Sequence, residues 1–337
     1  MNEGPRTDSG SLIIESSVER AGKGPARRLG LLAALTLTAF GIPSALAARA
    51  AADPVIAAAG DIACAPSSQY YNGGNGTSDR CRQKYTSNLL ASANSVLTLG
   101  DNQYDTGKLS SFNQVFDRTW GRFRSIMHPA TGNHEYLTSG AAGYFDYFNG
   151  IGNQTGPAGN RSQGYYSFNV GTWHLIALNT NDGCTIVACG AGSAQEKWLR
   201  SDLASHPTTC TLAYWHAPRF SSGYSGNNTY TGALWQDLYN AGADVVLSGH
   251  SHDYERFAPQ NGSGGLERLR GIREFVVGTG GAFFTSLSSS PKPNSEVRQN
   301  NTFGVLQLTL HLASYDWKFF PESGKKYSDS GTGSCHA

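Results

Sequence analysis

Side chains that can bind metal ions follow short apolar runs at several points of this 337-residue sequence. Three runs end in a glycine that is followed at once by an aspartate or a histidine: Val55–Ala59 before Gly60-Asp61, Val96–Leu99 before Gly100-Asp101, and Val245–Ser248 before Gly249-His250. A continuous apolar run of this length is typical of a strand buried on both faces. Open α/β sheets bind ligands at the carboxyl ends of their strands, so we expect one site assembled from several strand ends.

Other polar residues extend this set and indicate its chemistry. The candidates are Asp61, Asp101, Tyr104, Asn133, His134, His216, His250 and His252. Carboxylate, phenolate, amide and imidazole groups together suit two adjacent metal ions that share one carboxylate. Such a pair of ions can hold the attacking and leaving oxygens of a phosphoryl transfer. Each residue alone has a simpler explanation, since an aspartate after a glycine usually forms a turn. The joint occurrence of Gly-Asn-His-Glu and Gly-His-x-His favours a site, whereas the other histidines are assigned to the core or the surface.

Periodic and apolar segments indicate the elements that must position these residues. Besides the three runs above, we expect strands over 165–170, 173–179, 211–215, 275–277, 303–310 and 313–320, and helices over 82–92, 194–203 and 231–240. The stripe Phe112, Val115, Phe116, Trp120 and Phe123 recurs at helical spacing and is typical of a core face. Polar loops are expected over 66–80, 150–164 and 285–301. No repeat or linker divides residues 48–337, which we interpret as a single domain.

The first 47 residues are typical of an export signal. Arg27-Arg28 precede an apolar stretch from Leu29 to Ile42 that is too short for a comfortable membrane span, and Ala45-Leu46-Ala47 fits a cleavage site. Paired arginines after a long polar region favour the twin-arginine route, which exports folded proteins. An ordinary secretory signal that contains the pair is the alternative. We therefore expect a secreted, periplasmic or cell-envelope protein with no stable membrane span after cleavage.

All six cysteines follow that segment, and an even number in an exported chain favours disulfides. We expect the pairs Cys64–Cys81, Cys184–Cys189 and Cys210–Cys335. The first two pairs would close short loops and the third is what remains, so this is one of 15 possible pairings. A thiolate metal site is the alternative, but the sequence contains no Cys-x-x-Cys.

The composition limits the class of partner. The net charge is +1, charged residues make up 15% of the chain, and 39% is hydrophobic, which suffices for a sizeable core. A nearly neutral chain of this kind does not favour binding to a polyanion such as DNA. We expect no nucleic-acid partner, and the phosphoryl-transfer chemistry of the candidate residues predicts a small phosphorylated substrate.

The ordered motifs resemble those of the calcineurin-like metallophosphoesterases and, within them, the purple acid phosphatases. They are Gly60-Asp61, Gly100-Asp101-x-x-Tyr104, Gly132-Asn133-His134-Glu135, His216 and Gly249-His250-x-His252, and the resemblance covers residues 55–281. Most other branches carry Asp-x-His in the first motif, whereas Ala63 stands at that histidine position here. Tyr104, three residues after Asp101, is the residue that the purple branch uses instead.

The resemblance implies two metal ions and assigns their ligands. Fe(III) would take Asp61, Tyr104, His252 and the shared Asp101, and a divalent metal (Zn, Fe or Mn) would take Asp101, Asn133, His216 and His250. It also implies that a metal-bound hydroxide attacks phosphorus, with Asp101 as the catalytic bridge and Asn133 and His134 touching the substrate. His134 would bind the phosphate or donate a proton to the leaving oxygen. A hydrogen bond to a metal ligand is its alternative role.

One stretch departs from the family. Plant and animal members carry further substrate histidines after the position of His216, but none lies between His216 and His250 here. Arg219 lies in this stretch and is a candidate phosphate ligand, with a plain surface cation as the alternative. The loss of those histidines leaves the substrate range open.

The resemblance implies a four-layer αββα sandwich, in which two mixed β-sheets lie face to face with helices outside. It also implies an enzyme, namely an acid phosphatase-like hydrolase of phosphate monoesters with a dinuclear metal centre, and the predicted signal would make it an exported one. Phosphodiesters or nucleotides are the alternative substrates. A protein that uses iron for redox chemistry, or one that only binds phosphate, is the alternative from another class.

Overall fold

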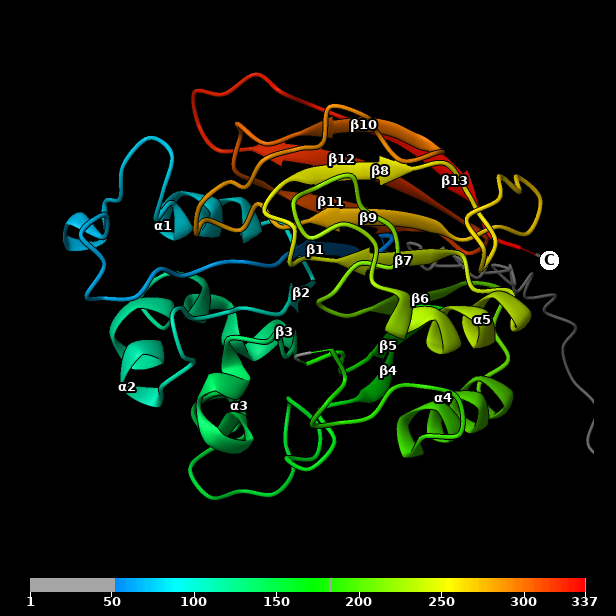
Figure 1. The fold of residues 1–337 in the computed structure, drawn as a ribbon, viewed down its shortest axis with the longest axis horizontal. Coiled ribbons are helices and arrows are strands. Elements are labelled where there is room, and N and C mark those ends of the chain that lie inside the picture. The colour runs from blue at the N-terminus through cyan, green and yellow to red at the C-terminus, as the bar shows by residue number, and fades with distance from the viewer. Residues whose placement is uncertain (1–51, 182, 337) are drawn as a thin grey trace, which may run out of the picture. The chain divides into compact units, whose positions relative to one another are not determined.

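The computed structural model describes residues 52–181 and 183–336 (Figure 1). The predicted signal peptide over residues 1–47, with its paired arginines, lies outside the described residues. Within the described part of the chain, no helix combines the length and the apolar character needed to cross a bilayer.

The first β-sheet has six strands in the order β13-β12-β11-β1-β2-β3. They are β1 (Val55–Ala59), β2 (Ser95–Leu99), β3 (Met127–Ala130), β11 (Gly304–Leu310), β12 (Ser314–Pro321) and β13 (Ser330–Ser334). β1, β2 and β3 are parallel, and the other neighbours pair antiparallel. The carboxyl ends of β1, β2 and β3 therefore meet at one edge of this sheet.

The second β-sheet has seven strands in the order β10-β8-β9-β7-β6-β5-β4. They are β4 (Tyr166–Val170), β5 (Trp173–Ala177), β6 (Thr211–Tyr214), β7 (Val245–Ser248), β8 (Tyr254–Phe257), β9 (Arg273–Val277) and β10 (Ser295–Gln299). β5, β6, β7 and β9 are parallel, whereas β4, β8 and β10 pair antiparallel with their neighbours. Both sheets are thus mixed: the parallel strands form one end of the first sheet and the centre of the second.

The α-helices are α1 (Gln83–Thr86), α2 (Leu109–Ser111), α3 (Ala142–Asn149), α4 (Ala194–Ser205) and α5 (Gly232–Asn240). Four of the five α-helices lie between neighbouring parallel strands, and α3 lies between β3 of the first sheet and β4 of the second. Short 3₁₀ turns cover Asn72–Gly74, Ser87–Leu90, Trp120–Ile126, Glu135–Leu137, Ser139–Ala141 and Thr229–Thr231, and a π-helical turn covers Phe112–Phe116. The hydroxyl of Ser193 accepts the N–H of Glu196 at 3.1 Å, so the sequence Ser-x-x-Glu caps the start of α4.

Alternating side chains of the second sheet point to opposite faces and pack in two separate apolar clusters. In β6, Leu212 and Tyr214 belong to the core that also contains Leu308 of the first sheet. Ala213, between them, belongs to a separate cluster with Trp235 of α5 and other residues of α4 and α5. Figure 1 shows α4 and α5 together, outside the strands of this sheet. A strand covered on both faces explains why such segments appear as continuous apolar runs.

The expected αββα arrangement of two mixed sheets flanked by helices is confirmed. The predicted aromatic stripe is also confirmed as core, since Phe112, Val115, Phe116 and Trp120 are buried and Phe123 packs against them. The three expected helices are present, although residues 82–92 form α1 followed by a 3₁₀ turn.

Strands at the sheet edges differ from the expectation. Residues 285–301 were expected to be a loop, but Ser295–Gln299 forms β10 at one edge of the second sheet. β3, β8, β13 and α3 have no counterpart among the expected elements. The sequence of β10 is polar because four of its five residues are exposed or only partly buried. β13 is glycine-rich because Gly331 and Gly333 lie against the rings of Trp317 and Tyr315. Neither pattern resembles an apolar or alternating strand.

The predicted cysteine pairs are all confirmed. The disulfides are Cys64–Cys81, Cys184–Cys189 and Cys210–Cys335. They span 17, 5 and 125 residues of sequence. Cys210 directly precedes β6 and Cys335 directly follows β13, so the third disulfide joins the second sheet to the last strand of the first.

We predict that removal of the Cys210–Cys335 disulfide, by replacing both residues with serine, lowers the free energy of unfolding by about 2–5 kcal/mol. The matched loss of Cys184–Cys189 should cost less, because a disulfide restricts the unfolded chain more when it closes a longer loop. Denaturant unfolding of the two double variants measures the difference. Equal losses, or thiols that react in the denatured wild type without reduction, would contradict this assignment.

Candidate metal centre

The predicted polar residues lie directly after parallel strands of both sheets. Asp61 follows β1, Asp101 and Tyr104 follow β2, and Asn133 and His134 follow β3 in the first sheet. His216 follows β6 and His250 and His252 follow β7 in the second sheet. The structure brings all of them together at one place where the two sheets meet.

Tyr104 is the centre of a first group of donor atoms. Its hydroxyl oxygen lies 2.9 Å from Oδ1 of Asp61, 3.1 Å from Oδ2 of Asp101 and 3.0 Å from Nε2 of His252. Nε2 of His252 is also 3.1 Å from Oδ1 of Asp61. All four residues are at least nine-tenths buried.

His216 is the centre of a second group. Its Nε2 atom lies 3.1 Å from Oδ1 of Asn133, 3.2 Å from Nδ1 of His250 and 3.3 Å from Oδ2 of Asp101. The same Asp101 oxygen therefore belongs to both groups. Asp101, His216 and His250 place one donor atom each within 4.8 Å of one another.

Backbone groups determine which side-chain atoms face the centre. Nδ1 of His216 lies 2.8 Å from the carbonyl oxygen of Leu99, and Nδ1 of His252 lies 2.8 Å from that of Phe283. A carbonyl only accepts hydrogen bonds, so each Nδ1 carries a proton and each Nε2 is left to bind a cation or a further proton. This is the orientation that metal-ligating histidines adopt.

The two aspartates are held in the same way. Oδ2 of Asp61 accepts the backbone N–H of His250 at 2.8 Å, and Oδ1 of Asp101 accepts that of His134 at 2.9 Å. The other oxygen of each carboxylate faces the imidazole and phenol groups. Carboxylate oxygens, lone pairs of imidazole and an amide oxygen thus converge, and only a positive charge can satisfy them together. The donor set fits metal ions.

The pKa values of the donor residues also indicate that a positive charge is favoured in the centre. Burial lowers the pKa of His216, but the charges of Asp101 and Asp61 and the hydrogen bonds with Asp101 and Leu99 together outweigh it and raise that pKa to about 10. Burial raises the pKa of Asp101, but the charges and hydrogen bonds of His216 and His134 together outweigh it, and the pKa is lowered. Burial and the neighbouring His216 lower the pKa of His250 to about 4. A cation in the centre would replace the proton that the carboxylates otherwise attract to His216.

Local backbone geometry explains the glycines that precede the ligands. Asp61, Asp101 and His250 all have positive φ angles, of 60°, 47° and 66°, which are uncommon for residues other than glycine. Gly100 has a φ of 84°, and a Cβ atom there would lie 2.6 Å from Nδ1 of His216. A Cβ atom at Gly132 would overlap the Asp101 carboxylate. The glycines thus give the turns their shape and leave room for the ligands.

Glu135 holds the loops that carry the ligands. Its buried carboxylate accepts the backbone N–H groups of Asp101, Asn102, Gln103 and Gly132 at 3.0, 2.8, 3.3 and 2.7 Å. Burial and the charge of Asp101 raise the pKa of Glu135 to about 7, although the hydrogen bonds from the backbone act in the opposite direction. Glu135 therefore joins the turn after β2 to the turn after β3.

His134 lies at the edge of the centre. Its side chain is 29% exposed, its Nδ1 lies 2.5 Å from the carbonyl oxygen of Asp105, and its Nε2 lies 3.8 Å from Oδ2 of Asp101. The ring is tilted against that of Tyr104 with 4.4 Å between centroids. The exposed Nε2 can contact a substrate that lies over the buried donors.

Arg219 is not brought to this place. Its guanidinium donates to the carbonyl oxygen of Gly262 at 3.1 Å and lies over the Phe220 ring at 4.8 Å, and its backbone N–H is held by Glu274. Within the described residues it makes no recorded contact with the predicted ligands. The role of Arg219 in phosphate binding stays a prediction, and in this structure its side chain joins the loop after β6 to the segment around Gly262.

Sequence reasoning missed the groups that orient the ligands. The carbonyl oxygens of Leu99 and Phe283 have no sequence signal, because every residue type has a backbone carbonyl and only the folded position of these two brings them to the histidines. Thr285, whose hydroxyl accepts the N–H of His252 at 3.2 Å, lies in a segment that was expected to be a plain loop. Only the distance in space, not the spacing in sequence, identifies these contacts.

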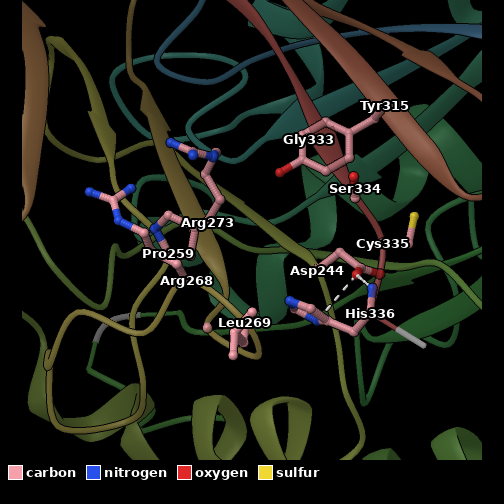
Figure 2. Close-up of a pocket in the computed structure, with 11 residues that line it drawn as sticks. Asp244, Pro259, Arg268, Leu269, Arg273, Tyr315, Gly333, Ser334, Cys335 and His336 are labelled. Carbon is pink, nitrogen blue, oxygen red and sulfur yellow. Dashed lines mark hydrogen bonds and ion pairs between the residues drawn. The ribbon is translucent and has the colours of Figure 1, made fainter.

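A cavity away from the donor cluster is lined by residues of both sheets. It measures about 330 Å³, and Figure 2 shows Asp244, Arg273, Tyr315 and His336 around it. Asp244 directly precedes β7 and Arg273 begins β9, so the cavity is at the amino ends of these strands. The donor cluster lies at their carboxyl ends, and the two are therefore separate.

Comparison with known proteins places these residues in a family pattern. The pattern of the calcineurin-like phosphoesterases matches residues 54–254, which include every residue of the cluster. Purple acid phosphatase 15 of Arabidopsis thaliana is 31% identical over 150 residues, which are 41% of this chain and 27% of that protein. An uncharacterized protein of Mycobacterium tuberculosis is 27% identical over 207 residues, which are 52% of this chain and 39% of that protein. The chain thus spans between a quarter and two fifths of the length of these relatives.

Two solved structures share the fold. A purple acid phosphatase from yellow lupin (Lupinus luteus) seeds superposes with a TM-score of 0.67 at 21% identity, over 84% of this chain and 54% of that chain. GAP50 of Plasmodium, the anchor in the inner membrane complex, gives a TM-score of 0.62 at 15% identity, over 85% and 90% of the two chains. At these sequence identities the two superpositions show a shared fold and nothing further.

We predict that Glu135→Gln lowers metal affinity by about 10- to 100-fold while the chain stays folded. The amide replaces one acceptor oxygen with a donor, so at least one backbone N–H of the two turns loses its partner. Metal titration followed by elemental analysis, with circular dichroism for the fold, measures both effects.

Glu274→Gln is the matched control for this variant. Glu274 is also a buried carboxylate that accepts two backbone N–H groups, from Arg219 and Phe220, but it does not hold the turns after β2 and β3. Equal metal affinity in the Glu135 variant and the wild type would show that Glu135 does not position the ligands.

Proposed function

Because the chain belongs to the calcineurin-like phosphoesterase family, we propose that it hydrolyses phosphate monoesters at a dinuclear metal centre, as a purple acid phosphatase-like enzyme. The observation that carries the proposal is the shared carboxylate. Asp101 contributes one oxygen to both donor groups, 3.1 Å from the Tyr104 hydroxyl and 3.3 Å from Nε2 of His216. Two neighbouring cations bridged by one carboxylate suit phosphoryl transfer.

The two donor groups would hold two different ions. Asp61, Tyr104, His252 and Asp101 would hold Fe(III), because a phenolate and two carboxylates are hard, anionic donors. Asp101, Asn133, His216 and His250 would hold a divalent ion such as Zn, Fe or Mn, because imidazole and amide ligands are neutral. The bound ions supply Lewis acidity and lower the pKa of water in the site.

The residues of the chain would orient the ester and move the proton. The buried donors form one wall of the site, and His134 stands at its exposed edge. The Asp105 carbonyl holds Nδ1 of His134, so Nε2 is the atom directed to a substrate. Nε2 would bind a phosphate oxygen, or donate a proton to the leaving oxygen as the ester bond breaks. Asn133, beside it in sequence, would also contact the phosphate.

The surroundings of this reaction are part of the proposal. Three disulfides support an exported protein, because disulfides persist in oxidising compartments. The partner would be a small phosphorylated molecule, since the substrate must reach donors that lie below the surface.

We predict that Asp101→Asn reduces phosphatase activity by more than about a hundredfold and lowers the metal content of both positions. The amide removes the negative charge that both groups share. Turnover of a chromogenic monoester and of the corresponding diester, with metal analysis of the same samples, measures the effect and compares the two substrate classes. Asp244→Asn is the control, because this buried aspartate accepts N–H groups of Thr211 and His336 far from the centre. A fully metallated, active Asp101 variant would rule out the two-metal proposal.

We predict that Tyr104→Phe removes a visible absorption band from the iron-loaded protein. A phenolate on Fe(III) absorbs visible light by charge transfer, and the variant keeps the ring while losing the oxygen. Absorption spectra are recorded at equal iron content for the wild type, this variant and Tyr144→Phe. Tyr144 is a control because its hydroxyl donates to the carbonyl of Pro129 instead. Equal spectra for the wild type and the Tyr104 variant would mean that Tyr104 is not a ligand.

A further inference from the structure

A second cavity adjoins the donor cluster. It measures about 180 Å³ and is separate from the larger cavity of Figure 2. Aromatic rings, small apolar side chains and a disulfide form most of its lining, and the charged groups are one arginine and one aspartate. The lining residues used here are Tyr70, Arg80, Tyr104, Asp105, Phe283 and the Cys64–Cys81 disulfide.

Three contacts join this cavity to the cluster. Tyr104 forms part of the cavity wall while its hydroxyl faces Asp61 and Asp101. The Phe283 ring lies 4.2 Å from the ring of His252, and the Phe283 carbonyl holds Nδ1 of that histidine. The Asp105 carbonyl faces Nδ1 of His134. The cavity is thus on the side of the centre where His134 would meet the leaving oxygen.

The loop that carries Arg80 is fixed in place. The Cys64–Cys81 disulfide closes it, the N–H of Cys81 donates to Ala282 at 2.9 Å, and the N–H of Arg82 donates to Gly281 at 2.7 Å. The Arg82 side chain also pairs with the buried Glu322 at 2.7 Å. Residues 80–82 are therefore attached to the segment that contains Phe283, which reduces the entropy lost when a ligand binds.

Arg80 lies against the aromatic part of the cavity. Its guanidinium carbon is 4.7 Å from the centre of the Tyr70 ring and 5.5 Å from that of the Phe283 ring. Within the described residues its ion pair is with Asp79 at 3.9 Å, and both side chains are well exposed, at 39% and 66%. Solvent weakens such a pair, so the planar cation remains available to stack on a further ring.

We propose that this cavity binds the leaving group of the substrate and selects a planar aromatic one. The proposal rests on the proposed phosphatase function. Tyr70 and Phe283 offer ring edges and faces, and Arg80 offers a cation that attracts the electron-rich face of a ring. In the reaction the oxygen of water bonds to phosphorus, the bond from phosphorus to the leaving oxygen breaks, and that oxygen departs with a proton. Inorganic phosphate and an aromatic alcohol are the products.

Benzyl phosphate and cyclohexylmethyl phosphate test the selection. Both leave as primary alcohols of similar size, but only one carries an aromatic ring. We expect Arg80→Ala and Tyr70→Leu each to lower kcat/KM for benzyl phosphate by about three- to tenfold, which corresponds to the strength of one ring or cation–ring contact. For cyclohexylmethyl phosphate the change should stay below about twofold, because the saturated ring gains nothing from stacking.

Arg270→Ala is the matched control. Arg270 also lies over a tyrosine ring, 5.5 Å from that of Tyr239, but Tyr239 belongs to helix α5 and does not line the cavity. It should leave both substrates unchanged. Metal content and thermal unfolding are measured for each variant, and benzylphosphonate, which is not hydrolysed, gives the inhibition constant that reports binding alone.

The outcomes separate this inference from the function on which it rests. Equal losses for both esters in metal-replete Arg80→Ala and Tyr70→Leu would overturn the aromatic subsite and leave the phosphatase intact. A wild type that hydrolyses neither ester at full metal content would overturn the proposed function itself. A selective loss for benzyl phosphate, with weaker inhibition by benzylphosphonate, would support the subsite.

Discussion

Two sheets meet around a buried negative charge, the carboxylate of Asp101. One of its oxygens is held by the N–H of His134, and the other faces the Tyr104 hydroxyl and His216 at the same time. A charge taken out of water is stable only with hydrogen bonds and an opposite charge near it. The turn geometry, the close approach at Gly100 and Gly132, and the four N–H groups held by Glu135 all keep this carboxylate where both donor groups can use it.

The sequence predicted those parts of the molecule whose physical cause is local. Apolar runs that end in Gly-Asp or Gly-His-x-His are visible because a strand covered on both faces must be apolar throughout and its turn needs a glycine. Cysteine pairing was also predictable, since few residues separate two of the three pairs. The edge strands β10 and β13 were not, because their pairing partners lie elsewhere in the chain and their own residues are polar or glycine.

Arg219 and Arg80 show where reasoning from sequence stops. Arg219 lies three residues after a predicted ligand, and its guanidinium donates to the carbonyl oxygen of Gly262. Arg80 belongs to a polar loop without a recognisable motif, and a disulfide with two backbone hydrogen bonds brings it beside the centre. Side-chain direction at a strand end, and the fixing of a long loop, depend on contacts between distant segments. The spacing of residues along the chain predicts neither the side-chain direction nor the position of the loop.

The donors come from both sheets, with Asp61, Asp101 and Asn133 on one and His216, His250 and His252 on the other. Neither sheet alone can assemble a complete set, so a cation would bind the docked sheets and not the separated ones. Binding would then add to the stability of the whole fold, by about 4 kcal/mol when the free ion exceeds its dissociation constant a thousandfold. Folding and metal loading become one equilibrium. If the protein crosses a membrane already folded, as its paired arginines predict, the compartment in which it folds also decides which ions it carries.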